Sequence, residues 1–218
     1  MIPYLADDDD IAFPPVDQAI IDREANGLLC AGGSLSPGRL INAYQNGIFP
    51  WYSEGEPILW WSPNPRAVIF SKDIHISRST RRTMRKGVFE IRHNTAFKAV
   101  VEACAAPRVQ QADTWILPEM IQAYSELHRL GYAHSYECWH QDKLVGGVYG
   151  IKINGVFCGE SMFSAMTNAS KIALIHIAQL TEYDLIDCQI PNPHLLSLGA
   201  STIARADFIQ LLKDEPNV

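Results

Sequence analysis

Two polar side chains separated by one residue are the first candidates for chemistry. Apolar and polar residues alternate in residues 185–189, which predicts a β-strand with Asp187 and Gln189 on one face. A carboxylate beside an amide can hold that amide so that its oxygen accepts a hydrogen bond from a reacting N–H group. Because an ordinary Asp is a weak base, we expect an orienting and electrostatic role for Asp187. Polar residues on a short strand also occur without catalysis, and the alternation leaves both interpretations open.

Glu160 is a further carboxylate in a predicted strand, which covers residues 156–163. A single Glu among apolar neighbours usually has a structural partner. It can also bind a positively charged group of a ligand, because a charge-assisted hydrogen bond to a carboxylate is strong. The sequence around Glu160 is compatible with both roles.

Residues 77–87 concentrate positive charge in an acidic chain. The net charge is −6, but residues 72–108 contain nine Lys/Arg and three Asp/Glu. A helix that Ser77 caps and Gly87 ends is predicted here. Its arginines have the spacing i, i+3, i+4 and i+7, which places them on one face: Arg78, Arg81, Arg82 and Arg85. Such a face either pairs with acidic neighbours or contacts the phosphates of a nucleic acid.

The elements that must position these residues fall into two parts. Residues 1–115 are irregular and rich in Pro, Gly and Trp, with a helix from Ser36-Pro37 to about Asn46 and a short strand at 67–70. The second part is more regular. Its predicted helices are 118–130, 169–181 and 205–212, and its predicted strands are 133–140, 144–153, 156–163 and 185–190.

The predicted fold class is α+β. A small irregular N-terminal domain covers residues 1–66, with a boundary that can extend to about 115, and a C-terminal domain covers 67–218 with a mixed β-sheet flanked by helices. The order helix, three antiparallel strands, helix, strand is that of an N-acetyltransferase-like (GNAT-type) core, by analogy of fold. Residues 164–171, where such enzymes hold a pyrophosphate, contain no glycine, so an acyl donor other than acetyl-CoA is expected.

Composition excludes several classes of protein. No stretch approaches 18 uninterrupted apolar residues, so no membrane span is expected. The N-terminus carries an acidic run at residues 7–10 and lacks the basic start and apolar stretch of a secretory signal, which predicts a cytoplasmic location. The five cysteines show no C-x-x-C spacing and are predicted to be reduced core thiols. No histidine pairs with a cysteine at zinc-ligand spacing, so no metal site is expected.

Eleven short segments, in order along nearly the whole chain, carry a resemblance to a known family. Three of them are residues 43–51 (AYQNGIFPW), 58–66 (ILWWSPNPR) and 157–164 (FCGESMFS). The others are residues 26–29, 32–37, 75–79, 114–116, 131–135, 168–171, 185–189 and 197–200. The chain resembles the leucyl/phenylalanyl-tRNA–protein transferases.

The resemblance implies a reaction and its partners. Such enzymes move Leu or Phe, and less readily Met, from charged tRNA to the α-amino group of a protein that begins with Arg or Lys. The product enters N-end-rule degradation. The implied partners are Leu-tRNA, Phe-tRNA and the acceptor protein, with no metal or dissociable cofactor, and we expect a monomer. The resemblance assigns catalysis to Asp187 and Gln189 and suggests that Glu160 recognises the N-terminus of the acceptor.

A Leu or Phe donor requires an apolar pocket. The resemblance suggests Trp51, Trp115, Phe157, Met162 and Ile177 as its lining, with Tyr44 and Tyr124 nearby. Any one of these side chains can instead be ordinary core. The 3′ adenine needs an aromatic partner for stacking, and Trp51 is a candidate for this role as well. The arginine face at residues 78–85 is the expected tRNA contact.

Two other functions would explain part of the sequence. Another aminoacyl-tRNA-dependent peptide ligase would use the same chemistry, but such ligases usually have a longer chain with a tandem domain. An RNA-binding module without activity would explain the basic face, but it gives no reason for Glu160, Asp187 and Gln189 to match the family.

Overall fold

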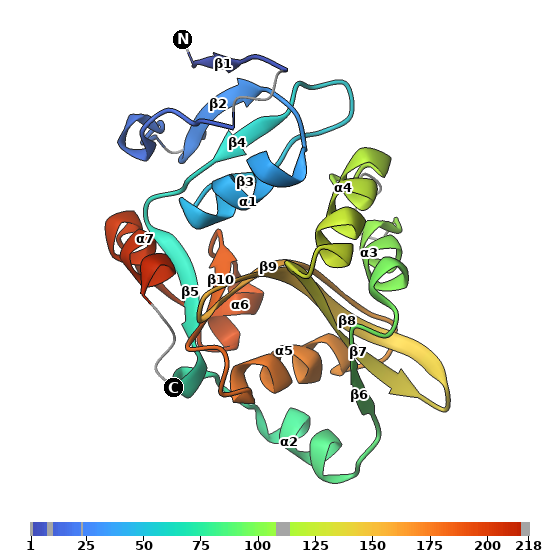
Figure 1. Cartoon of the computed structure of the whole chain (residues 1–218). Helices are drawn as coiled ribbons and strands as arrows, with labels where there is room; N and C mark the ends of the chain where they lie inside the picture. The colour runs from blue at the N-terminus through green and yellow to red at the C-terminus, as the bar shows by residue number, and fades with distance from the viewer. Residues whose placement is uncertain (1, 8–10, 23, 108–113, 215–218) are drawn as a thin grey trace.

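Two β-sheets and the surrounding helices form the structure (Figure 1), a computed structural model that describes residues 2–7, 11–22, 24–107 and 114–214. The smaller sheet has the strand order β1-β2-β4-β3. Its strands are β1 (Tyr4–Leu5), β2 (Leu28–Gly32), β3 (Phe49–Pro50) and β4 (Leu59–Trp61). Residues 8–10 of the acidic run lie outside the described residues.

The larger sheet has seven strands in the order β11-β5-β10-β9-β8-β7-β6. They are β5 (Arg66–Phe70), β6 (Glu90–His93), β7 (Ala133–His140), β8 (Lys143–Ile153), β9 (Val156–Ser164), β10 (Leu185–Gln189) and β11 (Ser201–Ile203). Only β9 and β10 pair in parallel in this sheet, and its other described ladders are antiparallel. The prediction of an α+β protein with a mixed sheet is therefore confirmed.

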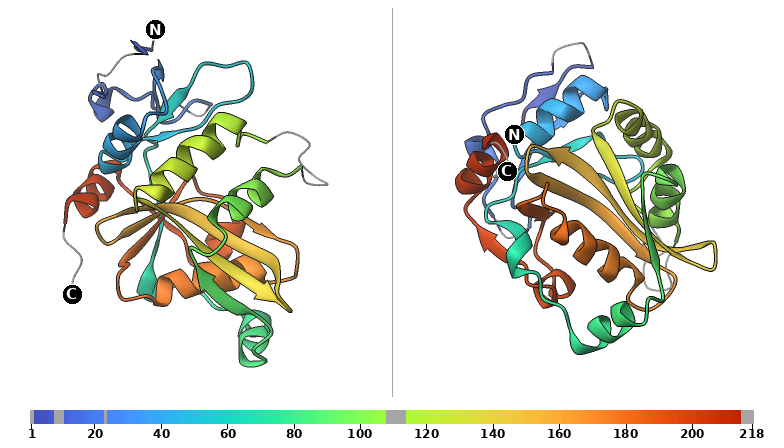
Figure 2. Two further views of the ribbon diagram at one scale, coloured as in Figure 1. Left: turned by 45° about the vertical axis from the view of Figure 1, so that its right-hand side comes forward. Right: turned by 60° about the horizontal axis from the view of Figure 1, so that its bottom comes forward.

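Helices cover both faces of the larger sheet (Figures 1 and 2). Helices α3 (Phe97–Ala105) and α4 (Pro118–Arg129) pack on one face, and α5 (Ala169–Gln179) packs on the other. Alternate strand residues follow this division, because successive side chains of a strand point to opposite faces. Tyr149 and Ile151 belong to the core beneath α3 and α4, whereas Val148 belongs to the core beneath α5.

Helix α1 (Pro37–Gln45) joins the smaller sheet to the larger one. Its buried residues Leu40 and Tyr44 share one hydrophobic core with Trp60 of β4, Tyr124 of α4 and Phe208 of α7 (Arg205–Lys213). The two sheets therefore do not have separate interiors.

The local signals for helix starts and turns are confirmed. Ser36 caps α1 by accepting a hydrogen bond from the backbone N–H of Arg39, and Ser77 caps α2 (Arg78–Arg85) in the same way. Asn154 has a φ of 49° in the turn between β8 and β9. The remaining helices are α6 (Pro193–Ser197) and the 3-10 helices Val16–Gln18 and Ser71–Asp73. Sequence analysis did not predict α3, α6 or the strands β1, β2, β3, β4, β6 and β11.

All five cysteines are free thiols; Cys188 is half-buried and the other four are buried. Within the described ranges, no helix has the length and apolar character needed to cross a bilayer.

Candidate active site

A cavity of about 410 Å³ opens where β9 and β10 separate. The ladder between these parallel strands ends at the pair Asp187 and Cys158, and residues that follow on each strand, among them Glu160 and Gln189, line the cavity. Its polar lining includes Glu160, Asp187 and Gln189, which hydrogen bonds connect to one another. The rest of its wall is largely apolar and includes Phe49, Trp51, Trp115, Val148, Met162, Leu174 and Ile186.

Asp187 is fully buried and forms an ion pair with Arg66 of β5. The guanidinium donates two hydrogen bonds to the carboxylate, from Nε to Oδ1 at 2.8 Å and from Nη2 to Oδ2 at 2.7 Å. A third Arg66 hydrogen bond reaches the carbonyl oxygen of Gly47. The guanidinium also lies between the rings of Phe49 and Phe208, at 4.8 and 4.6 Å from their centroids. Arg66 is thus held from several sides, and Asp187 is fixed with it.

Burial lowers the pKa of Arg66, but the neighbouring Asp187 carboxylate opposes this, and the net pKa lies above its usual value. The guanidinium therefore stays charged, and its charge stays opposite that of Asp187. A bidentate pair of this kind fixes geometry as well as charge. Sequence analysis did not assign Arg66 to the site; its signal is an arginine at the first position of an apolar strand.

Gln189 reaches the cavity through a β-bulge. The register between β10 and β5 shifts between Asp187 and Gln189, and Gln189 has a φ of 60°, in the left-handed region. Its backbone N–H donates to Asp187 Oδ1 at 2.9 Å. Its side-chain Nε2 donates to Glu160 Oε1 at 2.7 Å. The expectation that Asp187 orients the amide is wrong: Asp187 fixes the backbone of Gln189, and Glu160 holds the side chain.

Glu160 lies beneath the cavity with 8% of its surface exposed. Its Oε2 accepts a hydrogen bond from the Tyr124 hydroxyl at 2.9 Å, and that hydroxyl lies 2.5 Å from the hydroxyl of Tyr44. Burial raises the pKa of Glu160 to about 7, although the hydroxyls of Tyr44 and Tyr124 act in the opposite direction. Its charge state therefore changes near neutral pH.

The residues suggested for the pocket divide into three groups. Trp51, Trp115 and Met162 line the cavity. Tyr44 and Tyr124 lie beneath it and reach Glu160 by hydrogen bonds. Phe157 and Ile177 do not line it; both belong to the core beneath α5.

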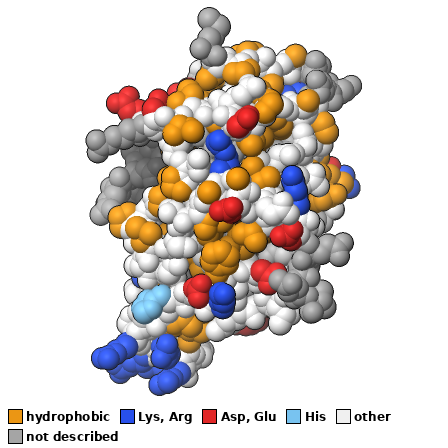
Figure 3. Space-filling view, turned by 90° about the vertical axis from the view of Figure 1, so that its left-hand side faces the viewer, with side chains coloured by type: hydrophobic (Ala, Val, Ile, Leu, Met, Phe, Trp, Pro, Cys, Tyr) orange, Lys and Arg blue, Asp and Glu red, His pale blue; other side chains and the backbone are white. Residues whose placement is uncertain are grey.

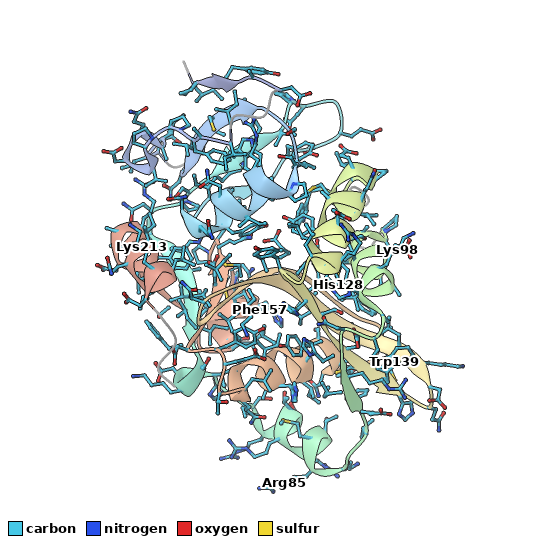
Figure 4. All side chains as sticks on the ribbon, viewed as in Figure 1. Arg85, Lys98, His128, Trp139, Phe157 and Lys213 are labelled. Carbon is cyan, nitrogen blue, oxygen red and sulfur yellow. The ribbon has the colours of Figure 1, made fainter. Side chains whose placement is uncertain are left out.

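Figure 4 labels Phe157 among the strands, and its ring packs against those of Tyr136 and Tyr183. Strand alternation explains this placement. The pairing of β9 with β10 sets Phe157 beside Ile186, one position before the pair at which the ladder ends.

Comparison with known proteins identifies the family. The profile of a family described as leucyl/phenylalanyl-tRNA protein transferase matches residues 68–213, and the profile of its N-terminal domain matches residues 33–64. The chain belongs to the leucyl/phenylalanyl-tRNA protein transferase family. The resemblance found in the sequence is confirmed.

Individual relatives agree over most of their length. A leucyl/phenylalanyl-tRNA–protein transferase of Nitrosomonas eutropha is 55% identical over 206 residues, which cover 93% of this chain and 87% of that protein. Proteins of the same name from Hahella chejuensis and Idiomarina loihiensis are 52% and 56% identical. The alignments cover 98% and 93% of this chain, and 91% and 86% of those proteins, respectively.

In this leucyl/phenylalanyl-tRNA protein transferase family member, the basic helix α2 lies at one end of the molecule. Figure 3 shows Lys and Arg side chains gathered there, and Figure 4 labels Arg85 at the same end. Its predicted tRNA-contacting residues are all exposed: Arg78, Arg81, Arg82 and Arg85. Among the residues that the structure describes, none of the four has an ion-pair partner. Pairing with acidic neighbours therefore does not explain this face.

Two further asparagines have described hydrogen-bond partners. Asn192 is the N-cap of α6, where its side-chain oxygen accepts a hydrogen bond from the Leu195 N–H at 2.9 Å. Asn168 of the α5 N-terminus donates to the Thr83 hydroxyl at 3.2 Å and so ties α2 to α5. The described part of the chain holds no group of three His, Cys, Asp or Glu side chains that could bind a metal ion.

Proposed function

We propose that this protein moves Leu or Phe, and less readily Met, from charged tRNA to the α-amino group of proteins that begin with Arg or Lys, which marks them for N-end-rule degradation. The observation that carries this proposal is the cavity itself. It joins an apolar wall that can hold the donor side chain to a polar end with Glu160 and Gln189. Family membership supports the same reaction.

The reaction is the aminolysis of an ester, so the enzyme must position two substrates and handle one proton. Asp187 and Gln189 form the proposed catalytic pair. The Arg66–Asp187 pair fixes the β10 bulge, and the bulge sets Gln189 at the cavity. Because Nε2 of Gln189 donates to Glu160, its Oε1 is left to accept a hydrogen bond from the attacking amine. Glu160 binds the positively charged N-terminal residue of the acceptor.

The donor site combines a side-chain pocket with an adenine platform. Trp115, Val148, Met162 and Leu174 provide apolar surface for Leu or Phe. Trp51 is 41% exposed and packs against Trp61 with ring centroids 5.5 Å apart. An exposed ring fixed in this way suits stacking of the 3′ adenine. The arginine face of α2 holds the phosphates of the tRNA, because its charges have no carboxylate partner among the described residues.

The same proposal extends to the organisation of the protein. We assign residues 1–66 and 67–218 to two domains that share one hydrophobic core. The second is of the N-acetyltransferase-like type, and its parallel strands β9 and β10 diverge at the site. The protein acts as a monomer, since one chain supplies both ends of the cavity. It works in the cytoplasm, where charged tRNA is available.

Transfer of radiolabelled Leu and Phe from charged tRNA tests this function. Four acceptors of identical sequence except for the first residue, which is Arg, Lys, Ser or Gly, provide the comparison. We expect transfer to the Arg and Lys acceptors only. Asp187→Ala and Gln189→Ala should each lower turnover by about 10²-fold or more while tRNA affinity changes little. Absence of transfer from both donors to all acceptors would refute the proposal.

A further inference from the structure

Three buried polar groups connect the cavity to helix α1. Glu160 Oε2 accepts from the Tyr124 hydroxyl at 2.9 Å, and the Tyr44 hydroxyl lies 2.5 Å from that of Tyr124. The Tyr44 hydroxyl is hydrogen-bonded to that of Tyr124 and also contributes a hydrogen bond to Glu160. Tyr44 and Tyr124 are each no more than 1% exposed. The chain of hydroxyls therefore ends on one carboxylate that itself borders the cavity.

Asp187 is poorly placed to accept a proton. It is fully buried, and its two oxygens accept the Arg66 pair and the backbone N–H of Gln189. Gln189 carries an amide, which does not act as a base near neutral pH. Glu160 differs from both, because its described hydrogen-bond donors are neutral hydroxyl and amide groups, whereas Asp187 is paired with a cation.

We propose that Glu160 accepts the proton of the attacking amine, and that Tyr124 and Tyr44 are positioning residues that hold its carboxylate in the charged form. This inference rests on the proposed aminoacyl transfer and adds the group that takes the proton. The same carboxyl group orients the Gln189 amide, because its Oε1 accepts from Nε2.

Aminolysis of the ester conserves atoms and charge when Glu160 carries the proton. The neutral α-amine donates one N–H to Gln189 Oε1 and another to Glu160. Its lone pair forms the C–N bond at the ester carbonyl carbon while Glu160 takes a proton from the nitrogen. The C–O bond to the ribose then breaks, and the proton passes from Glu160 to the leaving oxygen. One amide and one ribose hydroxyl replace one amine and one ester, and Glu160 is again a carboxylate.

Charged and titratable groups from several elements surround Glu160. They are Tyr44 from α1, Tyr124 from α4, Tyr149 from β8, Cys158 from β9, Asp187 from β10 and Arg66 from β5. Arg66 favours the charged form of Glu160, and Asp187 disfavours it. These two side chains form an ion pair, and their effects on the pKa of Glu160 are opposite in sign.

Tyr149 offers a matched control for the two positioning residues. Its ring packs against that of Tyr124 with centroids 5.7 Å apart, and it is equally buried. Within the described structure, its hydroxyl has no hydrogen-bond partner. Tyr149→Phe therefore removes a buried hydroxyl next to Glu160 without breaking the chain of hydrogen bonds.

The test is the pH profile of kcat at saturating charged tRNA and saturating Arg acceptor. Because the base must be deprotonated, wild-type kcat should fall about tenfold per pH unit below the pKa of Glu160, which is about 7. Tyr124→Phe and Tyr44→Phe remove support for the carboxylate, so this acidic limb should move upward by roughly half a pH unit or more. Tyr149→Phe should leave the limb in place. Glu160→Gln should lower kcat by about 10²-fold or more and leave only the acidic limb of the substrate amine, whose ordinary pKa is about 7.7–8.0.

Other outcomes overturn the inference. A Glu160→Gln variant that keeps the wild-type kcat shows that another group takes the proton. His194, which lies at the rim of the cavity, is the alternative to check, and loss of the limb in His194→Gln would assign the role there. If the acidic limb of the kcat profile moves equally in Tyr149→Phe and Tyr124→Phe, the hydroxyls of Tyr44 and Tyr124 act on Glu160 through packing alone and not through hydrogen bonds. A wild-type protein without any transfer refutes the proposed function itself, and this inference with it.

Discussion

Arg66 and Asp187 lie 121 residues apart in the chain, yet their ion pair sets the geometry of the candidate site. The pair is fully buried, and its partners include a backbone carbonyl and two aromatic rings. A buried ion pair adds little net stability compared with an apolar pair. Removal of one partner, however, leaves an isolated charge inside the protein. The pair thus contributes mainly a defined position for β10.

Arg66→Leu should lower the free energy of unfolding by about 3–5 kcal/mol, because it leaves the Asp187 carboxylate buried and unpaired. The double variant Arg66→Leu with Asp187→Leu should be less destabilised than Arg66→Leu alone. Urea denaturation of both variants measures the difference. A matched control is Arg92→Leu, which breaks solvent-screened pairs with Glu90 and Asp142 and should cost much less. Equal losses for Arg66→Leu and Arg92→Leu would contradict this account.

Glu160 should make stability depend on pH. Its pKa is raised from the ordinary 4.5 to about 7 in the folded protein. The folded state therefore keeps its proton while the unfolded state loses it, and stability falls as pH rises between these values. The fall attributable to Glu160 is on the order of 3 kcal/mol.

Unfolding free energies of wild type and Glu160→Gln across this pH range check the effect. The free energy of unfolding of wild type minus that of Glu160→Gln should fall as pH rises towards about 7 and stay constant above that pH. Parallel curves at all pH values would show that burial does not shift this carboxyl group.

At the scale of helices and strands, features that depend on adjacent residues were predicted from the sequence better than features that depend on residues far apart in it. The Ser36-Pro37 start of α1, the Ser77 cap of α2 and the turn at Asn154 depend on a few adjacent residues, and the sequence contains them. The bulge at Gln189 depends on Asp187, on Arg66 and on the register with β5. Alternation within residues 185–189 therefore predicted the right strand and the wrong partner for the amide.

The misplacement of Phe157 and Ile177 has a similar cause. A residue's type shows that it will be buried, but the face that it occupies depends on sheet pairing and on the helix that covers that face. Helix α3 and strand β6 lack strong terminal signals; α3, for example, begins without a side-chain cap. Their positions follow from packing against the sheet, which a single sequence does not display.

Helix α2 provides a prediction about tRNA binding. If its arginine face contacts phosphates, each Arg→Ala change should weaken tRNA affinity and lower the slope of log affinity against log salt by roughly 0.7–0.9. The choice between Leu and Phe should not change, because phosphate contacts carry no information about the amino acid. Arg78→Ala with Arg82→Ala should raise KM for charged tRNA far more than KM for the acceptor.

Binding measurements at several salt concentrations, together with thermal stability, check this prediction. Lys98→Ala on α3 is a suitable control, since Lys98 is exposed but pairs with Glu102 on its own helix. Unchanged affinity and slope in the double variant would mean that the α2 face is only a solvated surface.

At the scale of the whole molecule, the two sheets share one core. Trp60 of the smaller sheet belongs to the same buried cluster as Tyr124, Ile151 and Phe208. The cavity is also shared, since Trp51 follows β3 whereas Glu160 and Gln189 belong to the larger sheet. Without the other sheet, each sheet would expose its part of this shared core to solvent.

We therefore expect one cooperative unfolding transition, with equal calorimetric and van't Hoff enthalpies. Leu40→Ala on α1 removes a fully buried side chain and should cost roughly 2–5 kcal/mol, shifting the whole transition to lower temperature. Calorimetry on wild type and variant tests this. Two transitions, of which Leu40→Ala moves only one, would show that the sheets unfold separately.

The strand order has a consequence for the synthesis of the protein. Strand β10 lies between β5 and β9 in the sheet, although it follows both of them in the chain. A ribosome thus makes the two outer neighbours first and the strand between them later. Until β10 is inserted, Arg66 has no carboxylate partner and Glu160 has no amide beside it. Long-range insertion of this kind is slow compared with local helix formation. Aminoacyl transfer is therefore a property that the nascent chain gains in one late step.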